Sequence, residues 1–166
     1  LMEDLGALLN TYAPVAQSTF ADPRVQYVAD DGRRYLYANP NEKYDMIFID
    51  PLYSFTAGHN NLYSREAMEL YRSHLADGGI FCGWMNERHT IPATAASVFP
   101  YLEQFRDWVV AGNHPIEFDR EYMTAGYTSY TESNAGIFAD AAREPLKPDV
   151  IFLEYIGDRA CILEKD

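Results

Sequence analysis

Acidic residues stand at the ends of two segments of the sequence that are predicted to be strands. Asp50 directly follows the apolar run Met46–Ile49, and Asp30 and Asp31 follow a β-branched and aromatic segment. Open α/β sheets bind their ligands at the carboxyl ends of their strands, and a carboxylate there can accept hydrogen bonds or a proton. The sequence therefore predicts a ligand site that includes these carboxylates.

Each acid also has a structural alternative. A short helix is predicted to begin near Arg33, and an acid just before a helix commonly caps it. We expect one of Asp30 and Asp31 to have this structural role. Asp50 precedes Pro51 and could be a turn residue. A functional role is favoured because an acid at the end of a buried strand costs desolvation unless something pairs with it.

The acids belong to an alternation of predicted strands and helices. β-branched and aromatic runs predict strands, whereas amphipathic spacing with capping residues predicts helices. The predicted strands are 24–30, 44–50, 80–85, 105–110 and 116–123, with two more joined through Gly157 and Asp158, and the predicted helices are 1–13, 33–39, 64–79 and 93–99. This order predicts an α/β fold whose sheet is mostly parallel with an antiparallel edge.

The helix at 64–79 has the clearest local signals. Ser64 suits its amino end, Gly78 and Gly79 are expected to end it, and an apolar stripe is predicted to face the core. The stripe consists of Ala67, Leu70, Tyr71 and Leu75.

Composition restricts the partners and the compartment. The 166 residues carry 25 acidic against 13 basic side chains, a net charge of −12, which repels a phosphate backbone, so no nucleic acid partner is expected. The chain has no apolar run of the length that a membrane helix needs. Cys82 and Cys161 are expected to be buried thiols, and the four histidines lack ligand spacing, so no metal is expected. A reducing compartment, the cytoplasm, fits this cysteine usage.

Three blocks of the sequence resemble the polyamine synthase family, the spermidine synthase-like aminopropyltransferases of the Rossmann-type methyltransferase fold. The blocks are DPRVQYVADDGRRYL, YDMIFIDPLYS and NLYSREAMELYRSHLADGGIFCGWM, within residues 22–85. The resemblance implies transfer of an aminopropyl group from decarboxylated S-adenosylmethionine to a small-molecule amine. It also implies a homodimer.

The resemblance implies roles for individual residues. Asp31, with Gly32 beside it, matches the acid that contacts the adenine amino group of the nucleoside cofactor. The resemblance therefore favours Asp31 for the ligand and leaves the structural capping role to Asp30. Asp50 matches the acid that faces the reacting amine, where it can hold the ammonium form and accept its proton. Asp50 is therefore both the expected catalytic residue and part of the cofactor site.

The sequence departs from the family pattern beside Asp50. The family has D-x-x-D here, whereas this chain has Asp50-Pro51-Leu52-Tyr53, so a dication meets one carboxylate fewer. Tyr53, Tyr63 and Trp84 are expected to line the substrate pocket and stack on a cationic chain. As single aromatic residues, their alternative is an ordinary place in the core.

A second departure concerns the cofactor loop. The sequence contains no G-x-G loop, and the first two strands of the fold are expected to be absent from this chain. We therefore expect residues 1–166 to be one incomplete spermidine synthase-like domain. Two other functions stay open: methyl transfer from S-adenosylmethionine itself, and a non-catalytic interaction module that retains the fold.

Overall fold

The computed structural model describes residues 22–51, 58–85, 87–105, 107–119, 121–122, 125 and 157–158. The chain divides into two compact units, Leu1–Pro40 and Asn41–Asp166, and each is described by itself. The single domain expected from the sequence stays a prediction. The helix predicted at 1–13 lies outside the described residues.

In the first unit, the short helix predicted after the acid pair is present. It is α3, Gly32–Ala38, and Leu36 is its buried residue. The strand predicted at 24–30 is wrong, because no described strand pairs with this segment and a strand is defined by such pairing. Its apolar side chains Val25, Tyr27 and Val28 are all exposed.

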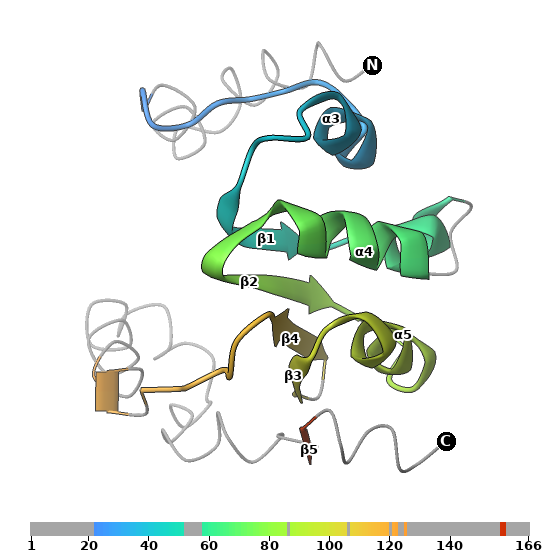
Figure 1. Cartoon of the computed structure of the whole chain (residues 1–166), viewed down its shortest axis with the longest axis vertical. Coiled ribbons are helices and arrows are strands. Elements are labelled where there is room, and N and C mark those ends of the chain that lie inside the picture. Colours follow the sequence, from blue (N-terminus) through green and yellow to red (C-terminus); the bar gives the residue numbers. More distant parts are fainter. Residues whose placement is uncertain are drawn as a thin grey trace, which may run out of the picture. The chain divides into compact units, whose positions relative to one another are not determined.

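The second unit contains a mixed five-stranded sheet in the order β1-β2-β4-β3-β5. β1 and β2 are parallel and run in the same direction in Figure 1, and the other three pairs are antiparallel. The strands are β1 (Tyr44–Ile49), β2 (Leu75–Trp84), β3 (Tyr101–Gln104), β4 (Trp108–Gly112) and β5 (Gly157–Asp158). The predicted α/β class and its antiparallel edge are confirmed. The sheet of described strands is mixed rather than mostly parallel, because only the β1–β2 pair is parallel.

Two helices, α4 (Arg65–His74) and α5 (Thr90–Val98), supply side chains to the core of this unit. The Phe81 ring of β2 stacks on Tyr71 of α4, with centroids 5.5 Å apart, and on Phe99, 5.7 Å away. Phe81 and Phe99 are fully buried, and truncating a buried phenylalanine costs about 3–5 kcal/mol. Ala67, Leu70 and Tyr71 of the predicted apolar stripe are buried on α4, whereas Leu75, also buried, is the first residue of β2.

The predicted end of α4 needs correction. Ser64 caps the helix as expected, and its hydroxyl accepts from the Ala67 N–H at 3.2 Å. The helix ends at His74, however, and Gly78 and Gly79 lie within β2. Gly78 has a φ of 76°, and the pairing shifts here by three residues, because Tyr44 pairs with Leu75 and Met46 with Ile80. The glycines therefore serve a bulge in β2.

The later predicted strands agree only in part. The strand predicted at 105–110 corresponds to β4, which continues to Gly112, and the one predicted at 116–123 is wrong because residues 116–119 have no strand structure. Gly157 and Asp158, predicted to join two strands, instead form β5 and pair with Gln104 and Glu103. The segments on either side of β5 lie outside the described residues.

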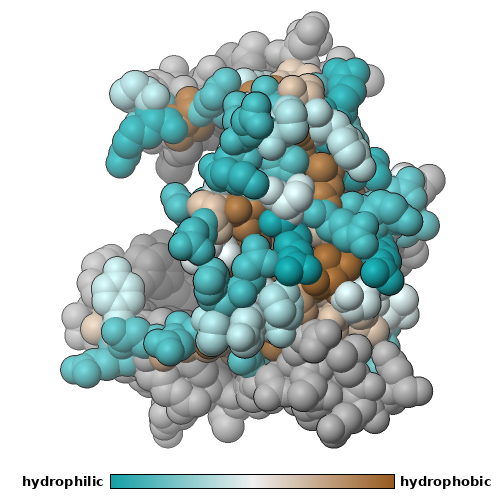
Figure 2. All heavy atoms as spheres, in the orientation of Figure 1, coloured by the Kyte–Doolittle hydropathy of each residue, from teal (hydrophilic) through white to brown (hydrophobic). Residues whose placement is uncertain are grey.

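The other face of the sheet is partly exposed. Met46 and Phe48 of β1 are 49% and 53% exposed, and the Phe48 ring lies 5.4 Å from that of Trp108. Figure 2 shows hydrophobic residues between predominantly hydrophilic ones on the face in view. β1 is therefore not the fully buried strand expected from its apolar run. No helix among the described residues is long and apolar enough to cross a membrane.

Cys82 lies in the middle of β2, between Phe48 of β1 and Val110 of β4 in the register. Its thiol is free and partly buried, and burial raises the pKa of this thiol. Cys161 lies outside the described residues.

Candidate functional site

Asp50 and Trp84 lie at the carboxyl ends of neighbouring parallel strands. Asp50 follows Ile49, the last residue of β1, and Ile49 pairs with Gly83 of β2, next to Trp84. This edge is where open α/β sheets bind ligands. The Asp50 side chain belongs to an exposed residue, so the desolvation argument made from the sequence does not apply. Exposure instead leaves the carboxylate accessible to a cationic ligand.

Tyr63 connects this edge to the segment before α4. It ends the short helix η1 (His59–Tyr63), is only 6% exposed, and donates its hydroxyl hydrogen to the Trp84 carbonyl oxygen. Burial, followed by the negative charge of Asp50, raises the pKa of the Tyr63 hydroxyl. Asp50 is therefore within electrostatic reach of Tyr63, and the structure brings Asp50, Tyr63 and Trp84 together at one edge.

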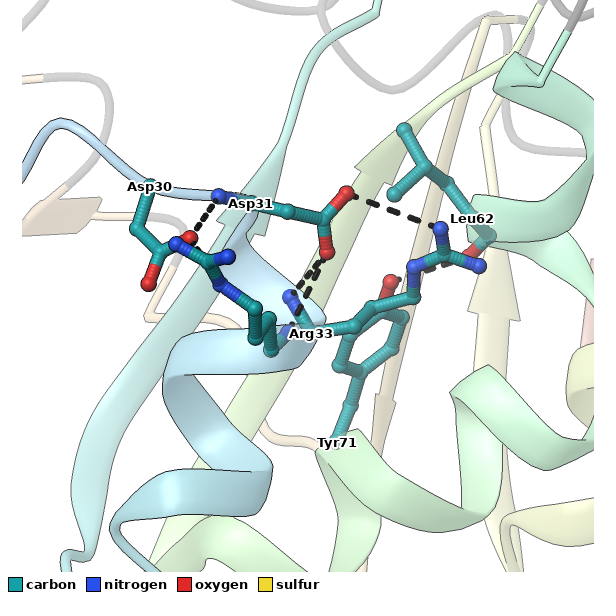
Figure 3. Close-up of polar contacts among 6 residues, drawn as sticks. Asp30, Asp31, Arg33, Leu62 and Tyr71 are labelled. Carbon is teal, nitrogen blue, oxygen red and sulfur yellow. Dashed lines mark hydrogen bonds and ion pairs between the residues drawn. The ribbon is translucent and has the colours of Figure 1, made fainter.

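The same segment has a second support from α4. The Tyr71 hydroxyl donates to the Leu62 carbonyl oxygen at 3.1 Å (Figure 3). Because both hydroxyls are bound to backbone carbonyls, η1 is fixed against the end of β2. Tyr63 is thus a buried core residue, which was the alternative to its predicted place in the substrate pocket. Its hydroxyl hydrogen is already donated to the Trp84 carbonyl oxygen. Its role in substrate binding stays a prediction, as does that of Trp84, which is half-buried.

The third aromatic residue expected to line the pocket, Tyr53, lies in the segment 52–57, outside the described residues. Its predicted contact with a substrate therefore stays a prediction.

Asp31 is the amino-terminal cap of α3. Its Oδ1 accepts from the backbone N–H groups of Arg33 at 3.0 Å and Arg34 at 3.1 Å, and Oδ2 lies 3.6 Å from an Arg33 guanidinium nitrogen (Figure 3). The Arg34 N–H, above all, lowers the pKa of Asp31, so the carboxylate is ionised at neutral pH. The capping role expected for Asp30 therefore belongs to Asp31.

Asp30 supports this arrangement from outside the helix. Its carboxylate accepts from the Asp31 N–H at 2.6 Å and pairs with the Arg34 guanidinium, also at 2.6 Å. The acid pair and the two arginines are thus linked to one another, which holds the start of α3 in one conformation.

Gly32 is the first residue of α3. A Cβ added to it would meet no heavy atom within 4 Å, and its φ lies outside the left-handed region. Neither space nor backbone conformation therefore requires glycine here. The open side of Gly32 leaves room for a ligand to approach the backbone beside Asp31.

Glu87, which the sequence analysis did not single out, caps α5 just beyond the end of β2. Its carboxylate accepts from the N–H groups of His89 at 3.0 Å, Thr90 at 2.5 Å and Ile91 at 3.1 Å. Burial raises the pKa of Glu87, but these N–H groups together outweigh it and lower the pKa overall. The signal in the sequence was an acid three residues before the helix.

The loop after β2 has a further anchor in Gln104. This side chain is 2% exposed and donates its amide hydrogen to the Arg88 carbonyl oxygen at 3.0 Å. The Met85 N–H also donates to the Asp107 carbonyl oxygen at 2.9 Å. The segment beyond Trp84 is thereby fixed to β3 and to the start of β4. Among the described residues, no three histidine, cysteine, aspartate or glutamate side chains are grouped to hold a metal ion.

Comparison with known proteins identifies the family of the chain. The model of the spermine/spermidine synthase domain matches residues 8–105, more than half of the 166-residue chain. The chain belongs to the spermine/spermidine synthase family. The resemblance drawn from the three sequence blocks is thereby confirmed, and all the expected site residues fall within the matched region.

Two curated relatives are similar to parts of the chain. Polyamine aminopropyltransferase 2 of Pseudomonas aeruginosa is 40% identical over 65 residues, which are 39% of this chain and 18% of that protein. The polyamine aminopropyltransferase of Korarchaeum cryptofilum is 26% identical over 117 residues, 70% of this chain and 36% of that protein. The chain therefore matches about a third or less of the length of these relatives.

Proposed function

We propose that the protein to which this chain belongs transfers an aminopropyl group from decarboxylated S-adenosylmethionine to a small-molecule amine. The observation that carries the proposal is the position of Asp50: an exposed carboxylate at the carboxyl end of β1, beside Tyr63 and Trp84 on the adjacent edge. The family and the aminopropyltransferase relatives support this class of reaction.

In the proposed reaction, the neutral amine nitrogen attacks the carbon next to the sulfonium. A new C–N bond forms, the C–S bond breaks, and its electron pair stays on sulfur, so that the nucleoside leaves as the neutral thioether 5′-methylthioadenosine. The amine must be neutral to attack, and the product nitrogen releases a proton. Asp50 holds the incoming ammonium and accepts the proton that the nitrogen loses.

Asp31 and Gly32 form the proposed adenine contact. Asp31 Oδ1 caps α3, and Oδ2, which lies 3.6 Å from an Arg33 guanidinium nitrogen, is the proposed acceptor for the exocyclic amine, beside the open face of Gly32. A carboxylate fixed in this way needs little reordering when the nucleoside binds. We expect the protein to which this chain belongs to act as a homodimer, as the family resemblance implies, and in the cytoplasm, which its cysteine usage favours.

The test is the Asp50→Asn variant of the protein, with Asp45→Asn as its control. Asp45 is an exposed acid on the same strand, so both variants remove one negative charge from β1 or its end. Turnover is measured as 5′-methylthioadenosine formed from decarboxylated S-adenosylmethionine with a panel of mono- and diamines. We expect Asp50→Asn to lower kcat by about 100-fold or more and to spare nucleoside binding, whereas Asp45→Asn retains activity.

Three other results would overturn the proposal. Equal activity of Asp50→Asn and the parent removes the role given to this carboxylate. Methyl transfer from S-adenosylmethionine without aminopropyl transfer assigns the site to methyltransferase chemistry. Failure of the folded protein to bind any nucleoside indicates an interaction module that retains the fold.

A further inference from the structure

A polar groove of about 720 Å³ lies in the second unit, separate from the residues of the candidate site. It is bounded by one side of α4, the end of α5 and the residues that follow β4. The lining residues are Arg65, Glu69, Arg72, Ser73, Ser97, Val98, Asn113 and His114. Its volume is in the range of sites that hold small molecules.

The topology places the far side of this groove at the opposite end of the strands from Asp50. Asn113 directly follows Gly112, the last residue of β4, and Gly112 pairs with Ile80, which precedes Gly83 in β2 by three residues. Asp50 instead follows the pair formed by Ile49 and Gly83, towards the carboxyl end. A ligand at Asn113 would therefore not occupy the amine site.

The groove is locally basic although the chain carries a net charge of −12. Arg65 and Arg72 line it against a single lining acid, Glu69, and the lining residue His114 contacts Asp77. The Lys43 ammonium adds a further positive charge beside it, because it donates to the Ser73 carbonyl oxygen. A concentration of positive charge on an otherwise acidic protein favours a small anion there.

Arg72 is prepared for such an anion by its own contacts. Nη1 donates to the Val98 carbonyl oxygen and Nε to Asn113 Oδ1, both at 2.7 Å. These two bonds fix the guanidinium plane, and Nη2 donates to no other described residue. Because Asn113 Oδ1 accepts from Arg72, the amide NH₂ of Asn113 is left as a second donor. A fixed guanidinium beside an amide donor is well suited to phosphate oxygens.

The acidic side chains near the groove do not cancel its positive charge. Arg65 pairs with Glu69 at 3.0 Å at an exposed position, where ion pairs are weak and readily exchanged. His114 Nε2 contacts the exposed Asp77 Oδ1 at 2.8 Å. Arg72 and Lys43 contact neutral oxygens and so keep their full charge for a ligand. The polar lining further favours a hydrophilic ligand over an apolar one.

We propose that this groove binds the phosphate group of a small phosphorylated molecule, with Arg72 as the main contact and Arg65 as a second positive charge. The volume exceeds what a single phosphate ion fills, so a sugar phosphate fits the groove better than inorganic phosphate. The site is independent of the proposed transferase activity.

The test is calorimetric titration of ribose 5-phosphate, inorganic phosphate and neutral ribose into the 166-residue chain at low ionic strength. We expect ribose 5-phosphate to bind more tightly than inorganic phosphate, ribose not to bind, and added salt to weaken binding. Arg72→Gln should weaken binding about tenfold or more, because it removes a charge-assisted contact. Glu69→Gln should tighten binding roughly twofold, because it removes the competing acid.

Arg88→Gln is the matched control. Arg88 pairs with Asp107 at 2.9 Å, much as Arg65 pairs with Glu69, but it does not line the groove. If Arg88→Gln weakens binding as much as Arg72→Gln does, the loss reflects a general effect of charge, and the proposal is overturned. Absence of binding by the folded parent chain, or equal binding of ribose, would also overturn it. If Arg72→Gln fails to fold, Arg65→Gln and Glu69→Gln decide, because they alter only an exposed pair.

Discussion

Replacing Tyr63 by phenylalanine tests whether the hydroxyl bond to Trp84 supports the candidate site. Phenylalanine retains the buried ring and deletes only the group that donates to the Trp84 carbonyl oxygen. A typical hydrogen bond contributes about 0.5–1.5 kcal/mol, and a buried acceptor left without its partner costs about 1–3 kcal/mol. Since Trp84 is only half-buried, water compensates in part. We expect the free energy of unfolding to fall by about 1–2 kcal/mol.

Urea unfolding at pH 7 measures this change, with Tyr101→Phe as the control. Tyr101 is 41% exposed and lies on β3, so losing its hydroxyl should change the unfolding free energy by less than about 0.5 kcal/mol. Similar effects of the two variants would refute the reasoning, because they would show that the Tyr63 hydroxyl contributes no more than one at the surface.

The same pair of proteins has a distinct pH dependence. The pKa of Tyr63 is raised in the folded state above its ordinary value of 10.0, so the unfolded chain loses this proton first as the pH rises. The parent is therefore destabilised above pH 10 by about 1.4 kcal/mol per pH unit, a loss that Tyr63→Phe lacks. The stability difference between them should shrink from pH 10 upwards, and a constant difference would contradict the raised pKa.

Two glycine substitutions should have opposite effects. Gly79→Ala places a Cβ 2.7 Å from the Tyr44 carbonyl oxygen, so we expect the unfolding free energy to fall by about 1–3 kcal/mol, and an unchanged urea midpoint would contradict the described bulge. Gly32→Ala meets no neighbouring atom and should stabilise the chain by about 0.4–1 kcal/mol while weakening 5′-methylthioadenosine binding in calorimetry. Unaltered nucleoside affinity would place the adenine elsewhere.

The elements predicted best were those specified by local physical signals. α4 could be predicted because Ser64 caps it and its apolar residues recur at helical spacing. Strand assignments depended on partners distant in sequence, which single-segment patterns do not contain. The segment 24–30 has strand-like composition but no described pairing, and the two-residue strand β5 arises only because it pairs with β3.

The site was predicted at the level of its edge and less well at the level of single contacts. The closeness of Asp50 and Trp84 could be predicted from the order of the strands, because the carboxyl ends of neighbouring parallel strands lie together. Either acid of the pair Asp30 and Asp31 could have capped α3, since they differ by one position and the choice depends on the helix start. The exposure of Asp50 also could not be predicted, because a strand's apolar composition does not reveal whether a neighbour covers it.

The position of Cys82 gives the chain an internal reporter of sheet opening. Thiolate, not thiol, reacts with alkylating reagents, and the raised pKa keeps this thiol protonated and slow to react while β2 stays paired on both sides. Labelling in a Cys161→Ser background should therefore become faster when β2 separates from its neighbours, because separation exposes the thiol further and lowers its pKa. A change in the alkylation rate would thus report a change in the packing around the strand that supports Trp84.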